Sequence, residues 1–250
     1  MRAEAKADLV KFPATPRGTV LALLSFFATR QARPGVRICG ALVSILICVA
    51  TAFEATLLRE QLDTGTIRIV ETGVGPVNAA HGVTVEILKV RPEAILSCGI
   101  AGAYPSSGLQ IGDVVCADTE VYGDLGAQSP NGFLDMKALG FPVVSAPSPL
   151  FNELPMQVFP LERRARFVTV STCTGTDAVA REIEARTRGA VENMEGAAIA
   201  HVAHLHEIPV GEIRGISNMV TNRDKSAWRL KEASEAAQDA AIRWVRTLRL

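Results

Sequence analysis

Continuous apolar runs, separated by segments with helical spacing, dominate the chain from Val43 onward. A run such as SILICVA does not alternate between apolar and polar residues, which is typical of a strand buried on both faces of a sheet. The segment at 111–124 is instead rich in β-branched residues, which also favours a strand. The expected strands are residues 44–50, 66–75, 93–104, 111–124, 166–175 and 210–218.

Helical periodicity fills the stretches between these strands. Pro76 stands at the first turn of a helix expected over 76–90, where its missing N–H costs nothing. Strands that alternate with helices predict an α/β fold, namely a single-domain three-layer sandwich with a mixed, mainly parallel central sheet. Further helices are expected at 52–62, 178–187 and 234–249, and a strand-to-helix transition at 190–206.

Two stretches fall outside this regular pattern. Residues 125–160 are rich in Gly, Pro, Ser and Asn, and we expect a loop with little regular structure beyond FNELPMQV. Residues 1–42 are expected to be an N-terminal extension that is not part of the fold, which leaves 43–250 as the domain. The apolar stretch at 20–28 is similar to a signal-peptide core, but acidic residues before it and polar residues after it weaken that interpretation. Its nine residues are also too few to span a bilayer.

The charge balance limits the classes of partner. Lys plus Arg and Asp plus Glu number 26 each, so the formal net charge is zero, and no basic run interleaved with aromatic residues is present. Such a chain has no global field that attracts nucleic acid or an acidic membrane surface. We therefore expect no nucleic acid and no membrane as partner, and a small molecule instead.

The cysteine and histidine patterns indicate neither disulfides nor a metal site. The five cysteines stand singly without CxxC spacing, which is typical of reduced thiols packed in the core of a cytoplasmic protein. His201 and His204 are not followed by a third ligand at helical spacing, so no metal is expected.

A glycine-rich turn, Gly73-x-Gly75, follows a strand and opens a helix, as in dinucleotide-binding folds. The acidic residue that such folds carry after the next strand is missing, because Glu93 precedes that strand. Pro76 also removes an N–H from the turn that would face a pyrophosphate. We interpret the turn as a site of close helix–strand packing and expect no cofactor.

Polar residues gather where the expected strands end. In a parallel α/β sheet the carboxyl ends of the strands form one rim, and ligands bind there. Glu54, Gly99, Thr176 and Asn218 follow four of the strands, and Glu195 stands where the chain becomes helical. Each acid taken alone is equally an ordinary first-turn residue favoured by the helix dipole. Two carboxylates and an amide on one rim, with small residues after Glu195, favour a site for a polar ring-containing ligand.

Several spaced motifs carry a family resemblance. STCTGT (171–176), ENMEGAAIAHVA (192–203) and IRGISN (213–218) are followed by Arg223-Asp224 and Trp228. Together they resemble the nucleoside phosphorylase and nucleosidase superfamily, and most of all its futalosine hydrolases, nucleosidases of an alternative menaquinone pathway. The resemblance covers about 44–250 and implies a purine nucleoside phosphorylase-like fold, no cofactor, and a homodimer or larger homo-oligomer.

The resemblance also implies roles for single residues. Glu54 matches the acid that orients and deprotonates the attacking water, and Glu195 matches the acid that accepts hydrogen bonds from the ribose hydroxyls. Met194 is expected against the sugar. Further substrate-binding positions are expected at Asn193, Gly99, Thr176 and Val179. Cleavage of an N-ribosidic bond passes through an oxocarbenium-like sugar, which buried carboxylates stabilise.

Two departures from related enzymes indicate the leaving base and the nucleophile. Asn218 stands where methylthioadenosine nucleosidases carry Asp, and an amide that offers both NH₂ and C=O suits a 6-oxopurine. Ala94 stands where a phosphorylase would carry a phosphate-binding Arg, which favours water as the nucleophile. The expected reaction is hydrolysis of futalosine to hypoxanthine and dehypoxanthine futalosine. A methylthioadenosine/adenosylhomocysteine-type or other purine nucleosidase, a phosphorylase and a non-catalytic nucleoside-binding protein remain alternatives.

Overall fold

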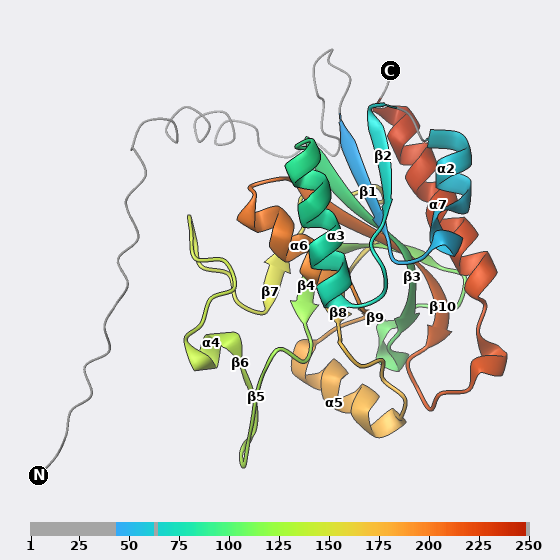
Figure 1. Ribbon diagram of the computed structural model, residues 1–250. Coiled ribbons are helices and arrows are strands. Elements are labelled where there is room, and N and C mark those ends of the chain that lie inside the picture. The colour runs from blue at the N-terminus through green and yellow to red at the C-terminus, as the bar shows by residue number, and fades with distance from the viewer. Residues whose placement is uncertain (1–43, 63–64, 249–250) are drawn as a thin grey trace, which may run out of the picture. The chain divides into compact units, whose positions relative to one another are not determined.

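Most strands of the described residues form one mixed sheet, seen in the computed structural model in Figure 1. The structure describes residues 44–62 and 65–248, so the predicted N-terminal extension 1–42 lies outside the described residues. Eight strands of the described residues belong to this sheet, in the order β10-β4-β8-β9-β3-β1-β2 with β7 beside β4. They are β1 (Ile45–Val49), β2 (Ile67–Glu71), β3 (Ala94–Ala103), β4 (Val114–Tyr122), β7 (Glu153–Pro155), β8 (Arg164–Thr169), β9 (Val191–Asn193) and β10 (Val210–Met219).

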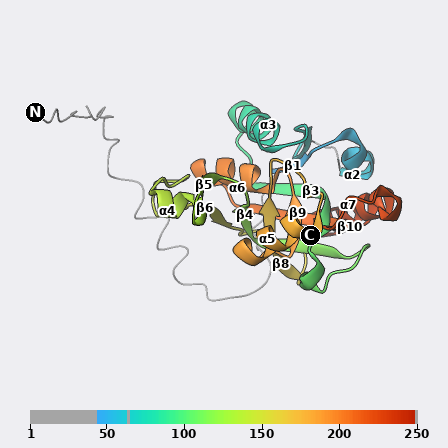
Figure 2. The same ribbon diagram turned by 90° about the horizontal axis from the view of Figure 1, so that it is seen from below.

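Parallel pairing predominates in the sheet, as predicted. Strand β1 pairs in parallel with β2 and β3, β3 with β10, and β8 with β4 and β9. The pairs β10–β4, β3–β9 and β4–β7 are antiparallel. Because β3 pairs with both β9 and β10, the strands β3, β10, β4, β8 and β9 close into a ring, which the sequence pattern did not predict. The ends of β3, β9 and β10 therefore lie side by side (Figures 1 and 2).

Helices cover the sheet on both faces (Figure 1). Helices α3 and α6 pack with one face, and α2 and α7 with the opposite face. The terminal helix was predicted from 234 but begins four residues earlier. The helical elements of the described residues are η1 (Ala52–Ala55), α2 (Thr56–Leu62), α3 (Pro76–Lys89), η2 (Pro105–Ser107), α4 (Met136–Leu139), α5 (Asp177–Thr187), α6 (Gly196–Leu205), η3 (Lys225–Ala227) and α7 (Leu230–Thr247).

Strand β1 shows why its apolar run is continuous. Ile45, Ile47 and Val49 pack into the cluster that contains α2 and α7, while Leu46 and Cys48 pack into the cluster that contains α3 and α6. Successive side chains point to opposite faces, and both faces are covered by helices. Burying one such side chain contributes about 1.5–3 kcal/mol. The strand therefore fixes the sheet between its two helical layers.

The stretch 125–160 contains more regular structure than predicted. Strands β5 (Gly126–Ser129) and β6 (Gly132–Asp135) form a separate two-stranded sheet, helix α4 follows, and β7 pairs with β4. Glycine and proline were interpreted as loop signals, but here they mark the turns between short elements. The four-residue α4 is capped by Asp135, whose side chain accepts the Ala138 N–H.

The cysteines of the described residues are free thiols, with Cys39 lying outside this part of the chain. Cys48, Cys98 and Cys116 are buried, as expected. Cys173 is exposed, so the expectation that every thiol packs in the core was wrong at this position. The reason is that β8 ends at Thr169, which leaves residue 173 in the connection to α5. Within the described residues, no helix is long and apolar enough to cross a membrane.

Candidate active site

A cavity of about 430 Å³ lies where β3, β9 and β10 meet the starts of η1 and α6, and we call it the Glu54–Glu195 cavity. Five of the predicted site residues line it: Glu54, Asn193, Met194, Glu195 and Asn218. They come from segments up to 164 residues apart in the chain, which the ring of strands brings together. The predicted rim at the strand ends therefore lies beside a cavity.

Glu54 is 3% exposed and its carboxylate is held at both oxygens. Oε2 accepts hydrogen bonds from the N–H and Oγ1–H of Thr51, at 3.1 and 2.9 Å, and Oε1 accepts the Ile100 N–H at 2.9 Å. The spacing of Thr51 and Glu54 is that of a capping box, so local sequence positions this acid at the end of β1. A Cβ at Gly99 would overlap Glu54 Oε1, so the close approach of β3 requires glycine there.

Glu195 lies at the N-terminus of α6 and is 5% exposed. Its Oε1 accepts the Gly75 N–H at 3.0 Å, and its Oε2 lies 3.5 Å from Nη2 of Arg214. Burial raises the pKa of Glu195, while the charge of Arg214 and the Gly75 N–H lower it. The glycine-rich turn Gly73-x-Gly75 thus contributes a donor to the cavity, a role beyond the packing that we predicted for it.

Arg214 is the residue at the centre of the site that sequence reasoning missed. It is 2% exposed, and its guanidinium bonds to Glu212 Oε1 at 2.7 Å, Ser97 Oγ at 3.2 Å and the Ile100 carbonyl at 3.2 Å. A buried Arg is stable only with such partners. The signal was present in the sequence, because Glu212 and Arg214 interrupt a strand that is otherwise apolar. Two residues apart, they share one face of β10.

Asn218 lies at the end of β10, and its amide has two partners in the protein. Ser217 Oγ donates to Oδ1 at 2.8 Å, and Nδ2 donates to the Met219 carbonyl at 3.1 Å. An Asn side chain has two N–H donors and two acceptor positions. One donor and one acceptor position therefore remain for a ligand.

Glu192 differs from Glu195 in that it accepts three hydrogen bonds from the protein, whereas Glu195 accepts two. Tyr104 Oη–H donates to Oε2 at 2.8 Å, and Thr174 donates from its N–H to Oε1 at 2.9 Å and from Oγ1 to Oε2 at 2.5 Å. These bonds tie the connection after β8 to β9. Glu192 therefore connects these two segments.

The remaining predicted residues divide into two groups. Met194 lines the cavity with its Sδ 3.1 Å from Cys173 Sγ, and Gly99 lies beside Glu54 without lining the cavity itself. Thr176 instead caps α5, where its Oγ1 accepts the Val179 N–H, and Val179 is 43% exposed. Neither Thr176 nor Val179 is among the cavity-lining residues, whereas Cys173 and Thr174 are.

The residues from 125–160 do not line this cavity, whereas Trp228 and Arg223 do. The Arg223 guanidinium lies 5.0 Å from the centroid of the Trp228 ring, which is within cation–π range. In the part of the chain that the structure describes, no group of three or more His, Cys, Asp or Glu side chains is placed to hold a metal ion.

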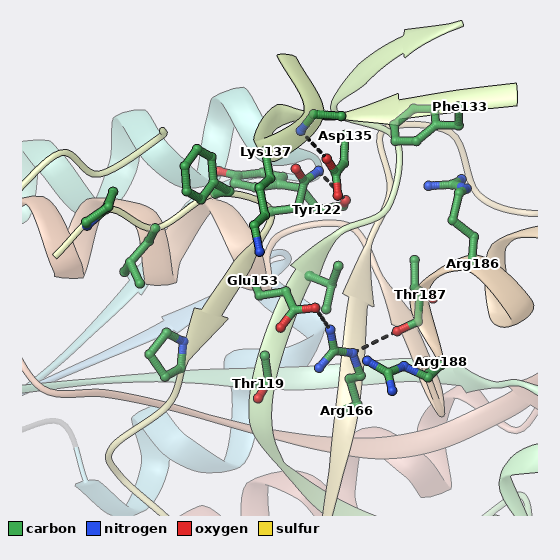
Figure 3. Close-up of a pocket in the computed structure, with 17 residues that line it drawn as sticks. Thr119, Tyr122, Phe133, Asp135, Lys137, Glu153, Arg166, Arg186, Thr187 and Arg188 are labelled. Carbon is green, nitrogen blue, oxygen red and sulfur yellow. Dashed lines mark hydrogen bonds and ion pairs between the residues drawn. The ribbon is translucent and has the colours of Figure 1, made fainter. Parts of the chain in front are cut away.

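A second, larger cavity of about 610 Å³ lies between the β5–β6 hairpin and the strands β4, β7 and β8 (Figure 3). Two of its arginines bind other groups of the protein. Arg166 forms an ion pair with Glu153 and donates from Nε to the Thr187 carbonyl at 2.7 Å. Arg186 donates to the Gly123 carbonyl at 2.6 Å and stacks on the Phe133 ring. We call this the Arg166 cavity.

Comparisons with known proteins agree with this geometry. The family model described as the phosphorylase superfamily matches residues 51–248. Futalosine hydrolase from Streptomyces coelicolor is 38% identical over 180 residues, which are 69% of this chain and 75% of that protein. Futalosine hydrolase from Acidothermus cellulolyticus is 34% identical over 79% of this chain and 88% of its own length.

The fold also matches solved structures. A 5′-methylthioadenosine/S-adenosylhomocysteine nucleosidase from Colwellia psychrerythraea, in complex with adenine, superposes with a TM-score of 0.70 at 20% identity. The match covers 82% of this chain and 96% of that one, so the predicted α/β architecture is confirmed. The chain therefore belongs to the phosphorylase superfamily and, within it, to the futalosine hydrolase family.

Proposed function

We propose that the protein is a nucleosidase that hydrolyses the N-ribosidic bond of futalosine and releases hypoxanthine and dehypoxanthine futalosine. One observation carries this proposal: two buried carboxylates, Glu54 and Glu195, line one cavity with the amide of Asn218. The 38% identity to the Streptomyces coelicolor futalosine hydrolase supports the choice of substrate.

Glu54 acts as the general base. Its Oε2 is occupied by the two donors of Thr51, whereas Oε1 accepts only the Ile100 N–H and keeps one acceptor position. A water molecule bonded there loses its proton to Glu54 as its oxygen bonds to C1′ of the ribose. The backbone bonds fix the direction of this carboxylate, so no reorganisation is needed when the water attacks.

Glu195 binds the ribose. Each of its oxygens has one partner in the protein, Gly75 N–H or Arg214 Nη2, so each keeps an acceptor position for one ribose hydroxyl. As the bond from C1′ to the base breaks, positive charge develops on the sugar ring. The carboxylates of Glu195 and Glu54 stabilise this charge, as carboxylates do in glycoside hydrolysis.

Asn218 binds the departing base. Its free N–H donates to O6 of a 6-oxopurine, where negative charge gathers as the bond breaks, and its free acceptor position receives N1–H. An amide also pairs with adenine, but it has no acidic proton to give to the ring of a base that must leave protonated. This difference favours hypoxanthine over adenine as the leaving group.

The other end of the substrate meets Trp228 and Arg223 in this proposal. The Trp228 ring offers a stacking surface. Among the described residues, the Arg223 guanidinium has no ion-pair partner within 4.0 Å. This combination favours an aromatic substrate group that carries negative charge.

Water is the proposed nucleophile rather than phosphate. Arg214, the guanidinium beside Glu195, already bonds to two carboxylates, a serine hydroxyl and a backbone carbonyl. A phosphate in this position would displace these bonds and meet the carboxylates of Glu54 and Glu195. The proposal also includes a cytoplasmic location and a homodimer or larger homo-oligomer. Light scattering of the purified protein measures the oligomeric state.

A substrate screen tests the proposal. Purified protein is incubated with futalosine, aminofutalosine, methylthioadenosine and inosine, each with and without phosphate, and the released base is measured. We expect hypoxanthine from futalosine at a rate that does not depend on phosphate. Adenine release from methylthioadenosine as the fastest reaction supports the alternative nucleosidase. Phosphate-dependent release supports a phosphorylase, and tight binding without release supports a nucleoside-binding protein.

A further inference from the structure

Two carboxyl groups meet beneath the start of α6, outside the set of residues that line the cavity. Glu120 of β4 and Glu212 of β10 are both 0% exposed. A Cβ at Gly196 would overlap Glu212 Oε2 and Glu120 Oε1 together, so these two oxygens lie against the same point of the backbone. Two ionised carboxylates in contact and away from water would repel each other strongly.

The hydrogen-bond donors around the pair do not satisfy both groups. Glu120 accepts from Asn193 Nδ2 at 2.5 Å and from Thr169 Oγ1 at 2.9 Å. Glu212 Oε1 accepts from Arg214 Nε at 2.7 Å. Within the described residues Glu212 Oε2 is buried and has no hydrogen-bond donor. A buried acceptor without a donor is costly, and the group beside this one is another carboxyl.

We propose that Glu120 and Glu212 share one proton in a carboxyl–carboxylate hydrogen bond, and that the pair acts as a positioning device for the ribose-binding Glu195. The proton supplies the donor that Glu212 Oε2 lacks. It also lowers the charge of the pair from two to one. Both residues are positioning residues, since they act on the substrate only through Asn193 and Arg214.

One connection runs from the pair through Asn193. Its Nδ2 bonds to Glu120, and its Oδ1 accepts the N–H groups of Glu195 and Gly196 at 2.9 and 2.7 Å. The amide therefore fixes the backbone from which the Glu195 side chain projects. These bonds explain why Asn193 lines the cavity with its amide turned to the protein rather than offered to a ligand.

The second connection runs through Arg214. Its Nε bonds to Glu212, and its Nη2 faces Glu195 Oε2 at 3.5 Å. Glu120, Asn193, Glu195, Arg214 and Glu212 thereby form a closed ring of contacts, completed by the shared proton. Such a ring holds the Glu195 carboxylate from its backbone and from its side chain at once.

The surrounding charges favour one retained proton. Burial raises the pKa of Glu120 well above its ordinary value, and the charge of Glu212 raises it further. Arg214 is the one cation of the cluster among the described residues, and it already faces Glu212, Glu195 and Glu54. Three other titratable groups interact electrostatically with Glu120 or Glu212. They are Tyr122, Cys98 and Cys116, and they stay neutral at ordinary pH because burial raises the pKa of each.

Infrared spectroscopy tests the shared proton without any activity measurement. The folded protein at neutral pH is expected to show the C=O band of a protonated carboxyl, and both Glu120→Gln and Glu212→Gln are expected to abolish it. Glu192→Gln is the matched control, because Glu192 is a buried carboxylate that three donors already satisfy, and it is expected to leave the band. A band that persists in both pair variants overturns the proposal.

Kinetics test the positioning role, and this part rests on the proposed nucleosidase function. The amide of Glu212→Gln keeps an acceptor for Arg214 and supplies an N–H to Glu120, so kcat/KM is expected to stay within about threefold of the unsubstituted protein. Glu212→Leu removes both bonds and is expected to lower kcat/KM about 10- to 100-fold, with a higher KM for the ribose substrate. Equal activity of the Leu and Gln variants overturns the positioning role.

The dependence of kcat/KM on pH separates a positioning role from a merely structural one, because a structural role would not change it. As pH rises, the pair of the unsubstituted protein loses its shared proton, so kcat/KM is expected to fall. Glu212→Gln carries an amide that does not titrate, and its profile is expected to lack this alkaline fall. If Glu212→Leu does not fold, the pH profile of Glu212→Gln and the infrared band still test the shared proton and the positioning role. If no tested nucleoside is cleaved by the unsubstituted protein, the proposed function fails while the infrared test still stands.

Discussion

The Arg166 cavity and the Glu54–Glu195 cavity are both lined by charged side chains, but the charges lie in different environments. The Arg166 cavity is the larger, about 610 against 430 Å³. Its acid Glu153 has a side chain that is 60% exposed and pairs with Arg166 at the surface. In the smaller cavity, Glu54 and Glu195 are 3% and 5% exposed. Their oxygens bond to backbone N–H groups and to a fully enclosed arginine.

We assign the proposed active site to the smaller cavity on this contrast in burial, not on cavity size. An ion pair with an exposed partner forms at little cost and contributes little, so the Arg166–Glu153 pair needs no function to explain it. Buried carboxylates are costly, and they persist where the surrounding structure supplies donors for them. Substitutions in one cavity, with substitutions in the other as controls, therefore test which cavity is the active site.

Replacement of Glu54 has the largest expected effect. Glu54→Gln keeps the shape of the side chain but removes its ability to accept a proton, so kcat is expected to fall about 10²- to 10⁴-fold. The measurement is hypoxanthine release from futalosine. Glu153→Gln in the Arg166 cavity is the control and is expected to leave kcat within about twofold. Full activity of Glu54→Gln would exclude Glu54 as the base.

Replacement of Asn218 is expected to change the preferred base. Asn218→Asp places a carboxyl that can carry a proton beside the purine, so adenine release from methylthioadenosine rises while hypoxanthine release falls. The ratio of the two kcat/KM values is expected to change about 10- to 100-fold. Asn131→Asp, an exposed turn residue outside the Glu54–Glu195 cavity, controls for added negative charge. An unchanged ratio would remove residue 218 from the explanation of specificity.

Replacement of Arg223 tests the part of the cavity that meets the non-purine end. Arg223→Gln removes an exposed guanidinium, so KM for a substrate with an acidic aromatic end is expected to rise about three- to tenfold, with little change for inosine. Lys225→Gln removes a neighbouring exposed cation that does not line the cavity, and its KM is expected to be unchanged. Equal effects of the two variants would indicate a long-range charge effect instead of a contact.

The pH dependence of the Glu54–Glu195 cavity follows from burial. The pKa of Glu195 is raised above its ordinary 4.5, chiefly by desolvation. The ionised form, which binds the ribose in the proposed function, is therefore lost at a higher pH than for an exposed carboxyl as the solution is acidified. The titration of the Glu195 carboxyl is measured as the infrared difference between the unsubstituted protein and Glu195→Gln. A midpoint at or below 4.5 would contradict the assignment.

Replacement of Arg166 has the smallest expected effect. Arg166→Gln breaks the ion pair with Glu153 and the hydrogen bond to the Thr187 carbonyl. The Glu153 side chain is largely exposed and one typical hydrogen bond contributes about 0.5–1.5 kcal/mol, so the free energy of unfolding is expected to fall by about 1–2 kcal/mol. Denaturant unfolding measures this change, and kcat/KM is expected to stay the same. A large loss of activity would show that the two cavities are coupled.

Several features of the fold follow from local pattern alone. The buried strands β1 and β3 appear as continuous apolar runs, Pro76 marks the start of α3, and the change of pattern after Val191 marks the step from β9 to α6. The β5–β6 hairpin was not predicted, because its turns and short strands have the composition of a loop. The strand predicted over 93–104 agrees with β3, including its continuation past Gly99.

The candidate site was predicted only where its residues lie next to boundaries that the local pattern shows. Glu54, Glu195 and Asn218 stand next to recognisable strand and helix boundaries, so their positions could be anticipated. Arg214 lies inside a strand, and its neighbours Ser97 and Ile100 belong to a different part of the chain. Thr176 was placed in the site because it follows a predicted strand, and Val179 by resemblance. The connection before α5 brings Cys173 and Thr174 to the cavity instead.

The sequence by itself determined the α/β layers, the positions of the strand ends and the identity of the two carboxylates and the amide, because these depend on periodicity and on residues that are close in the chain. Only the tertiary structure decided that β3 pairs with both β9 and β10, which closes the ring and brings Gly75, Arg214 and Glu195 together. Only it showed that Glu120 and Glu212 meet beneath Gly196. Such contacts join residues that are distant in sequence, and their free energy depends on burial and on partners that no local pattern specifies.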